Sequence, residues 1–370
     1  MKKKLLIYGA GAIGRGYLPW VFSEKFYDLY YVDVSKSLIS DIKKKKYYQT
    51  FKISNNKYIS KKVFPKKIYL LNEEIDFINN FDLIITCVGT RQVKNIVKNI
   101  SFFKKDILCL ENDPDIVDYL KKESKKKNIY FGIPDVITSN TASKKIKKIN
   151  KLNLITEDGL CFIDRKLKIK NTKAIFLNQK ELRVQWLAKF YIHNSSHCIA
   201  AYLGNRIKNI YVHEALQNTR IKKVIKDCIL ELSKMLIKKY SLDKKFTKFY
   251  GSKEFKRFSN KLLFDPISRV AREPFRKLQR KERLIGAANE CLSVGIKPNA
   301  LAVGILSAIQ YKNIKDEDSG IKILRKALDK KEFLKIILNL QDGEPLHQFL
   351  LKNWESNSLK LNSIKNDNRK

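Results

Sequence analysis

The chain has 370 residues, of which 44% are hydrophobic and 31% are charged. This composition favours packed globular domains over disorder, and the length favours two domains over one. The formal net charge is +39, from 76 Lys and Arg against 37 Asp and Glu. Because lysine is spread from end to end, the charge favours a compositional bias over a nucleic-acid-binding stripe, while leaving a general attraction for small anions.

The beginning of the chain and the cysteines carry no targeting or metal signal. The apolar run from Leu5 ends at Gly9, which is too short for a signal peptide. No stretch reaches the roughly 18 apolar residues of a membrane span. The six cysteines form no Cys-x-x-Cys pair, which favours reduced thiols over a zinc site or redox dithiol. We therefore expect a cytoplasmic protein without a metal.

Short apolar runs alternate with helical stretches in the first 140 residues. The predicted strands are 4–8, 30–33, 83–88, 107–110 and 129–132, and the helices between them are 12–25, 91–100 and 114–127. Pro19 should kink or delay the first helix. Alternation of this kind predicts an α/β domain with a doubly wound parallel sheet.

The pattern changes beyond about residue 145. Two short strands, 151–156 and 161–164, are separated by a Glu-Asp-Gly turn. From 181 onward, apolar residues recur at spacings of three and four, most clearly in 181–203, 220–240, 281–293 and 321–340. We predict a Rossmann-type domain over 1–180, with a strand-rich extension from about 145, then a mainly helical substrate domain over 181–358. The polar residues 359–370 are expected to form a disordered tail.

A glycine-rich turn follows the first predicted strand. Residues 9–14 read Gly-Ala-Gly-Ala-Ile-Gly and stand between a strand and a helix, the context in which Gly-x-Gly-x-x-Gly binds a dinucleotide. Gly9 would permit the tight turn, Gly11 the close approach of a pyrophosphate, and Gly14 the close packing of helix on strand. The N–H groups of the helix N-terminus would face the phosphates. The predicted cofactor-binding residues of this turn are Gly9, Gly11, Ala12, Ile13 and Gly14.

Asp33 ends the second predicted strand, where a carboxylate accepts hydrogen bonds from the ribose of the adenosine half. A 2′-phosphate would meet its negative charge, so NAD is favoured over NADP. Gly89, which closes the strand at 83–88, is also assigned to the cofactor. The alternative is an ordinary glycine turn with a solvated acid. Arg15 could equally contact a phosphate or face solvent.

Polar residues gather in one segment of the helical half, which contains Lys189, His193, Asn194 and His197. On an α-helix with about 100° per residue they share one side, which is costly unless that side lines a polar cleft. Alcohol oxidation needs a base and donors that hold the developing oxyanion. A buried lysine can serve as the base, an asparagine amide as the donor, and a histidine can orient hydroxyls. A surface lysine beside a core histidine remains the alternative.

The spacing Lys189-x4-Asn194-x2-His197 resembles the signature of the polyol-specific long-chain dehydrogenase/reductase family, also called the mannitol dehydrogenase family. The likeness extends to residues 8–16, 82–89, 111–112, 200–204 and the arginine-rich segment 269–284. It implies metal-independent hydride transfer between a polyol carbon and NAD, with Lys189 as general acid/base. It further implies that Asn194 and Asn112 stabilise the oxyanion and that His197 binds a substrate hydroxyl.

Asp135 lies where the resemblance places a carboxylate near the active site, but Val136 stands where the family usually has an arginine, which puts the local salt bridge in doubt. His193 also departs from the family, which tends to carry an apolar residue there. It is either an extra substrate contact or a tolerated variant at the cleft edge.

Arg269, Arg272 and Arg276 are three and four residues apart, and the resemblance connects their segment to the branch that uses phosphorylated polyols. Guanidinium groups suit a phosphate, from one helical turn or, because Pro274 interrupts the helix, from a loop. The alternative is a cluster that pairs with acids at a domain interface. The reaction implied for this branch interconverts D-mannitol 1-phosphate and D-fructose 6-phosphate.

Three other functions remain open. The first is a family relative that acts on an unphosphorylated polyol or a uronate such as fructuronate or tagaturonate. The second is a dehydrogenase of the 6-phosphogluconate type, which has a different lysine–asparagine spacing and lacks the following histidine. The third is a basic binding protein that has kept a Rossmann shell. The expected partner is a small polyol phosphate, with no specific nucleic acid and no membrane, and the expected state is a monomer or homodimer.

Overall fold

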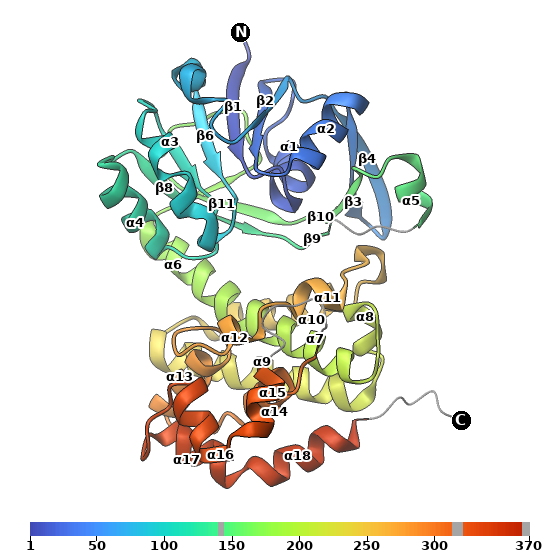
Figure 1. Ribbon diagram of the computed structural model, residues 1–370, viewed down its shortest axis with the longest axis vertical. Coiled ribbons are helices and arrows are strands. Elements are labelled where there is room, and N and C mark those ends of the chain that lie inside the picture. Colours follow the sequence, from blue (N-terminus) through green and yellow to red (C-terminus); the bar gives the residue numbers. More distant parts are fainter. Residues whose placement is uncertain (140–143, 313–320, 365–370) are drawn as a thin grey trace. The chain divides into compact units, whose positions relative to one another are not determined.

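The computed structural model describes residues 1–139, 144–312 and 321–364. The chain divides into two compact units (Figure 1). The first comprises Met1–Gln185 with Leu262–Phe264, and the second comprises Trp186–Lys261 with Asp265–Lys370. The first unit therefore ends a few residues beyond the predicted boundary near 181, and a short later segment returns to it.

The first unit is built on an eight-stranded sheet with the order β12-β11-β8-β7-β6-β1-β2-β5. Its neighbouring strands are parallel except for β8 and β11, which are antiparallel. The strands are β1 (Lys3–Tyr8), β2 (Tyr27–Asp33), β5 (Lys67–Leu70), β6 (Leu83–Thr86), β7 (Ile107–Cys109), β8 (Ile129–Asp135), β11 (Leu160–Asp164) and β12 (Ile175–Leu177). This architecture confirms the predicted α/β class with a mostly parallel sheet.

A second sheet of four strands, in the order β4-β3-β10-β9, completes the first unit. It consists of β3 (Tyr48–Ser54), β4 (Lys57–Val63), β9 (Thr138–Ser139) and β10 (Leu154–Glu157). The predicted strand-rich extension is thus divided, because β10 joins this small sheet while β11 and β12 join the large one. The hairpin of β3 and β4 was not predicted, since lysines interrupt its apolar alternation.

The helices of the first unit are short. They are η1 (Ala12–Tyr17, a π-helix), α1 (Leu18–Val21), α2 (Lys36–Lys45), η2 (Ile75–Asn80), η3 (Thr90–Asn95), α3 (Val97–Ser101), α4 (Asp115–Ser124) and α5 (Lys144–Ile149). The helix predicted over 12–25 therefore ends at Val21. Pro19 lies in the first turn of α1, where its missing N–H costs nothing, so it marks a junction between two helical segments.

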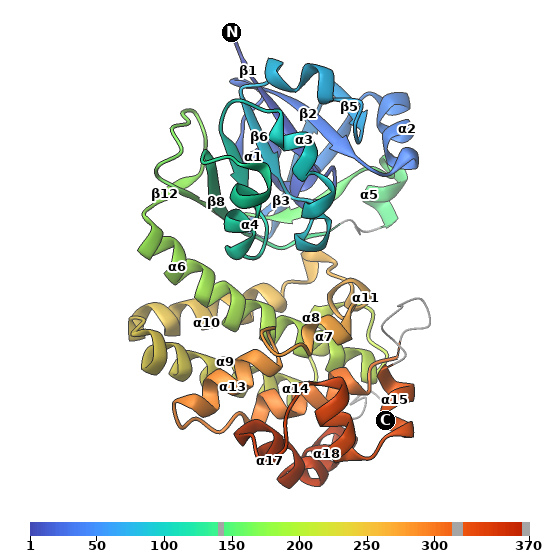
Figure 2. The ribbon, with the colours of Figure 1, turned by 60° about the vertical axis from the view of Figure 1, so that its left-hand side comes forward.

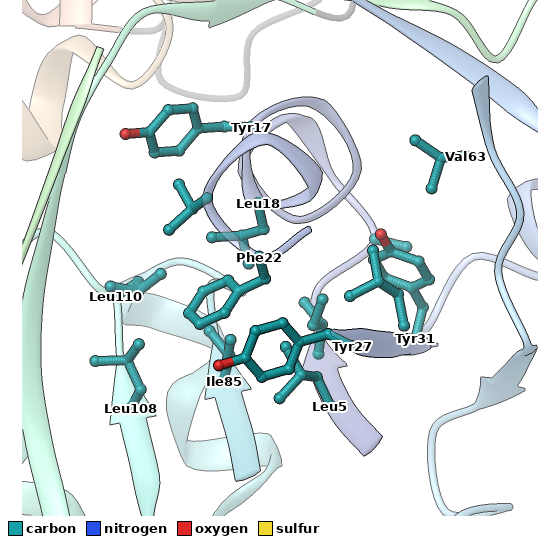
Figure 3. Packing of buried hydrophobic residues seen from close by; sticks show 14 of the residues in the cluster. Leu5, Tyr17, Leu18, Phe22, Tyr27, Tyr31, Val63, Ile85, Leu108 and Leu110 are labelled. Atoms are coloured by element: carbon teal, nitrogen blue, oxygen red, sulfur yellow. The ribbon is translucent and has the colours of Figure 1, made fainter. Parts of the chain in front are cut away.

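Both faces of the large sheet are buried. Along β1, Leu5 and Ile7 belong to one hydrophobic cluster, while Leu6 and Tyr8 belong to another. Figure 3 shows the first cluster, in which Leu18 and Phe22 lie over the side chains of the sheet. A strand buried on both faces is a continuous apolar run, and this is why β1 could be predicted from its sequence.

The second unit is helical (Figure 2). Its central helix α7 packs against α8, α9, α11 and α14. The elements are η4 (Ala188–Ser195, a π-helix), α7 (Ser196–Arg206), α8 (Val212–Ala215), α9 (Thr219–Tyr240), α10 (Lys244–Phe258), α11 (Ile267–Val270), α12 (Pro274–Lys277), α13 (Ile285–Ser293), α14 (Asn299–Ile309), α15 (Ile321–Ala327), α16 (Lys330–Glu332), η7 (Phe333–Ile337), α17 (Pro345–Lys352) and α18 (Trp354–Ser363). Two elements span the boundary between the units, α6 (Gln179–Leu187) and η5 (Lys261–Leu263). The prediction of a mainly helical second half is confirmed.

The predicted tail begins later than expected. α18 continues to Ser363, and Leu361 within it is fully buried, so the prediction of disorder from residue 359 was wrong for this helix. A buried apolar side chain holds the otherwise polar segment in place. Residues 365–370 lie outside the described residues. Among the helices that the structure describes, none is long and apolar enough to cross a bilayer.

Candidate active site

The glycine turn between β1 and η1 depends on missing side chains. Gly9 has φ +98°, and a Cβ atom there would lie 2.6 Å from the carbonyl oxygen of Cys87. A Cβ atom on Gly14 would lie 2.0 Å from the carbonyl oxygen of Gly9. At Gly11 such an atom would meet nothing within 4 Å among the described residues. The turn is therefore closed at Gly9 and Gly14 and open at Gly11, an arrangement that fits close approach of a ligand.

Asp33 is held beside this turn. Its Oδ2 atom accepts a hydrogen bond from the backbone N–H of Ala10 at 2.9 Å, and its Oδ1 atom accepts one from the N–H of Ser35 at 2.9 Å. The side chain is only partly buried. The structure thus brings the predicted ribose-binding acid to the glycine turn, while its contact with ribose remains a prediction.

The other predicted residues of the first unit follow neighbouring strands of the large sheet. Gly89 follows β6, Asn112 follows β7, and Asp135 is the buried last residue of β8. The carboxyl ends of parallel strands meet at one edge of a sheet, so these residues share that edge with the glycine turn. Ala12 and Ile13 begin η1 at the same edge.

Glu111 had no predicted role of its own, although it orders this edge. It accepts hydrogen bonds from the N–H of Val88 at 3.0 Å and from the N–H of Gly89 at 2.8 Å. Burial raises the pKa of Glu111, and these backbone donors oppose the rise. The carboxyl group thereby fixes the loop that carries Gly89, directly before Asn112 in the chain.

Arg15 does not face solvent, so that interpretation of it was wrong, while a contact with a phosphate stays a prediction. Its side chain is buried, donates to the carbonyl oxygens of Ala10 (2.6 Å) and Leu152 (2.8 Å), and lies over the ring of Tyr48. Arg15 therefore connects the glycine turn to the segment before β10.

Lys189 and Asn194 lie in the π-helix η4 rather than in an α-helix. A π-helix forms i→i+5 hydrogen bonds, so residues five apart, such as Lys189 and Asn194, lie one turn apart on one side. The α-helical period assumed from the sequence was therefore wrong for this segment. Lys189 is buried. The Nδ2 atom of Asn194 is buried without a hydrogen-bond partner in the part of the chain that the structure describes.

His197, in the first turn of α7, is held on two sides. Its Nε2 atom is 2.8 Å from Oδ2 of Asp265, and its ring stacks on Phe258 with centroids 4.8 Å apart. Arg269 donates to the other oxygen of Asp265 from Nε at 3.0 Å. Burial alone would raise the pKa of Asp265, but Arg269 and His197 hold it well below its usual value. A charged carboxylate therefore fixes the orientation of the His197 ring.

His193 forms a second histidine–carboxylate pair. Its Nδ1 atom is 2.5 Å from Oε2 of Glu254, whose other oxygen accepts a hydrogen bond from Arg257 at 2.5 Å. Glu254 is completely buried, and the rings of His193 and His197 lie 5.1 Å apart. His193 is thus part of a buried ion-pair network beside the candidate catalytic residues.

Glu254 and Asp265 were missed in the sequence because they lie 61 and 68 residues from their histidine partners. A signal did exist. Each acid stands three or four residues before an arginine, Arg257 and Arg269, with which it pairs.

The three predicted phosphate-binding arginines have different environments. Arg269 pairs with Asp265, and Arg276 pairs with Glu273 at 3.0 Å and Glu282 at 2.7 Å. Arg272 is exposed between α11 and α12, which Pro274 begins. The three arginines therefore do not lie on one continuous helix. Two of the arginines bind carboxylates of the helical unit, which is the pairing with acids that the alternative interpretation expected. The domain-interface location of that alternative and the phosphate role of all three arginines remain predictions.

Lys277 is a further residue that the sequence did not single out. It is buried, lies over the ring of Tyr202, and donates to the carbonyl oxygens of Val270 (2.6 Å) and Arg272. Burial lowers its pKa to about 7. No feature of the sequence distinguishes the buried Lys277 from the many surface lysines. Among the described residues, no three His, Cys, Asp or Glu side chains are placed to hold a metal ion.

Comparison with known proteins matches both units. The mannitol dehydrogenase Rossmann domain matches residues 3–130, and the mannitol dehydrogenase C-terminal domain matches residues 186–348. The mannitol-1-phosphate 5-dehydrogenase of Caldanaerobacter subterraneus is 28% identical, covering 95% of this chain and 97% of its own length. That of Buchnera aphidicola is 30% identical, covering 85% of this chain and 88% of its own length.

A solved structure supports the fold. The mannitol 2-dehydrogenase of Pseudomonas fluorescens, in a ternary complex with NAD and D-mannitol, superposes with a TM-score of 0.79 at 12% identity, covering 98% of this chain and 92% of that chain. The fold and the domain matches define an oxidoreductase with a Rossmann unit and a helical unit. The chain belongs to the mannitol dehydrogenase family.

Proposed function

We propose that the protein is an NAD-dependent dehydrogenase that interconverts D-mannitol 1-phosphate and D-fructose 6-phosphate without a metal. Relatives with the name mannitol-1-phosphate 5-dehydrogenase match nearly the whole chain, which supports this substrate. The observation that carries the chemistry is the buried amide of Asn194, an unpaired donor within the described structure, one π-turn from the buried Lys189.

NAD fits the first unit. The open space at Gly11 would receive the pyrophosphate, and Asp33 beside the turn would bind the adenosine ribose. The negative charge of Asp33 disfavours the 2′-phosphate of NADP. When bound, NAD accepts a hydride from the alcohol carbon, and NADH returns it in the opposite direction.

The side chains of the second unit would handle the proton and the charge. Lys189 takes the proton of the substrate hydroxyl during oxidation and returns it during reduction. Asn194, with Asn112 as the predicted second donor, donates a hydrogen bond to the oxygen as negative charge develops on it. His197, oriented by Asp265 and Phe258, binds a neighbouring hydroxyl. Asp135 is the proposed carboxylate at the edge of the site.

One observation favours a second candidate, a relative that acts on an unphosphorylated polyol or a uronate. Arg269 and Arg276 are already paired with carboxylates, so only Arg272 of the three is exposed. If the substrate carries a phosphate, Arg272 is therefore the residue that we propose to bind it, with Arg269 and Arg276 supporting the segment.

NADH absorbance with fructose 6-phosphate, fructose and the two uronates tests the proposal. We expect oxidation with fructose 6-phosphate only. Arg272→Glu should raise KM for fructose 6-phosphate by about tenfold or more, since a charge-assisted pair becomes a repulsion. Lys352→Glu, an equal charge change on α17, is the control. Equal rates with fructose, or turnover of a uronate alone, would transfer the assignment to the second candidate.

A further inference from the structure

The helical unit contains a groove that the proposed reaction does not use. The groove has a volume of about 1160 Å³ and is lined by α9, the start of α10, the segment before α14, the first turns of α14 and the end of α18. Lys189, Asn194 and His197 do not line it. Its basic side chains are Arg220, Lys223, Lys234, Lys238, Lys244, Lys297 and Lys360. We call this surface the basic groove.

The groove follows one face of α9. Its lining residues on this helix, from Arg220 to Lys238, recur at spacings of one and three, which is the solvent-facing side of an α-helix. At 1.5 Å per residue this face is about 27 Å long. The opposite face of α9 is in the core, where Ile221, Ile225 and Leu232 are fully buried. The groove is therefore long and runs along a helix whose opposite face is buried in the core.

The groove also has apolar lining. Val224, Ile237, Ile296, Val303 and Ile364 contribute to it, and each is at least partly buried. Leu230 lies in the lining as well and is 53% exposed. Apolar side chains between rows of lysines form an amphipathic surface, unlike an ordinary solvated face.

The groove carries a net positive charge. Seven of its 19 lining residues are Lys or Arg, and two are acids. Its two acids are Asp227 and Glu231, and Glu231 already accepts hydrogen bonds from the N–H groups of Ala300 and Leu301. Most of the basic charge is thus left for an anionic partner.

The side-chain ammonium groups of five of the lysines have no ion pair or hydrogen bond within the described structure. The other two cations donate to backbone carbonyl oxygens, Arg220 to Ser363 and Lys238 to Val294. The five are Lys223, Lys234, Lys244, Lys297 and Lys360. A carboxylate near them would gain attraction without breaking an internal salt bridge.

We propose that the basic groove docks an acidic amphipathic helix of a partner protein. Apolar residues at three and four spacing would enter the groove, while flanking carboxylates would meet the lysines. About 18 residues of helix would match the length of the α9 face. A small ligand would leave much of so long and open a groove empty. A second copy of this chain, at +39, would be repelled, and a nucleic acid would leave the apolar lining unused.

A synthetic helical 18-residue peptide tests this proposal, with leucines at three and four spacing and glutamates elsewhere. Fluorescence anisotropy at 0.1 M salt should show saturable binding to the full chain. A triple variant, Lys223→Glu with Lys234→Glu and Lys297→Glu, should weaken binding at least about tenfold through loss of charge complementarity. Leu230→Ser should weaken it about threefold through loss of apolar contact.

The matched control is a triple variant with the same charge change outside the groove, Lys222→Glu with Lys248→Glu and Lys352→Glu, which should change affinity less than about twofold at this ionic strength. Thermal unfolding and NADH oxidation of both triples show that the fold is intact. Equal losses in both triples, or equal binding of a scrambled peptide, would overturn the proposal. Tighter groove-dependent binding of an 18-base-pair DNA or of phosphatidylglycerol vesicles would also overturn it.

Discussion

The two units carry their candidate functional groups in different ways. In the first unit the site is mostly backbone: Gly9 and Gly14 are required because a Cβ atom would collide, and Asp33 binds the N–H of Ala10. In the helical unit the site consists of buried side chains, and His197 depends on Asp265, which is 68 residues away. A local sequence motif therefore specifies the first site, while long-range pairs complete the second.

This difference shows where motif analysis is strong. A backbone turn depends on residues within a few positions of one another, so its spacing can be read directly. A buried histidine–carboxylate pair depends on which helices pack together. The carboxylate of Glu254, on α10, reaches His193 in η4 only in the folded unit. Substitutions at Lys189, Glu254, Asp265 and Asp33 should therefore affect the two kinds of site differently.

Removal of the proposed base should disable the helical site and spare the Rossmann site. Lys189→Ala should lower turnover of fructose 6-phosphate by about 10²- to 10⁴-fold, the usual contribution of general acid–base catalysis. NADH fluorescence titration should show unchanged cofactor binding. Lys180→Ala, on the exposed side of α6, is the matched control. Near-normal turnover in the Lys189 variant would refute its role as the base.

Loss of the buried Glu254 carboxylate should lower the stability of the protein more than loss of any surface carboxylate. Glu254→Ala leaves Arg257 and His193 without their carboxylate, so the free energy of unfolding should fall by about 3–5 kcal/mol. Urea unfolding followed by circular dichroism measures this change. Glu355→Ala removes an exposed partner of Lys330 and should leave stability almost unchanged. Equal effects of the two variants would mean that the Glu254 network does not stabilise the unit.

Asp265 should make stability depend on pH in a defined direction. Its pKa is held below the usual value in the folded state, so its stabilisation is complete above the unfolded pKa of about 4 and is lost as pH falls through the folded value. Asp265→Asn should therefore lower the unfolding free energy by roughly 2 kcal/mol at pH 7. The difference in unfolding free energy between this variant and the unsubstituted protein should become smaller below pH 4.

Thermal midpoints measured from pH 3 to pH 8 test the Asp265 prediction. Asp342→Asn changes an exposed acid near Lys331 and serves as the control. If the thermal midpoints of Asp265→Asn and the unsubstituted protein differ by the same amount at every pH in this range, the charge of Asp265 is not the stabilising feature. Turnover should also fall in Asp265→Asn, since His197 loses its partner.

The smallest effect is expected at the Rossmann site. Asp33→Asn keeps an oxygen for the N–H of Ala10 but removes the negative charge, so the preference for NAD over NADP should fall about tenfold, or roughly 1.4 kcal/mol. The ratio of kcat/KM values for the two cofactors measures it. Asp28→Asn, near the other end of β2, is the control. An unchanged ratio would mean that Asp33 does not contact the ribose.

Most of the first unit could be predicted because its strands are continuous apolar runs with glycine turns between them. The hairpin of β3 and β4 could not, since its lysines hide the alternation. In the second unit, α14 was missed for the opposite reason. From Ala300 to Ile309 it is buried on all sides, so it has no amphipathic period to detect. The π-helix η4 also lacked a sequence signal.

Residue types at short spacing are enough to identify the glycine turn, the acid beside it, and Lys189, Asn194 and His197 as candidates. Their surroundings depend on how the folded chain packs. The tertiary structure placed carboxylates on both histidines and paired Arg269 and Arg276 with acids, leaving Arg272 exposed. The physical reason is that a buried charge requires an opposite charge nearby, and the packing of helices far apart in the chain determines which residue supplies it.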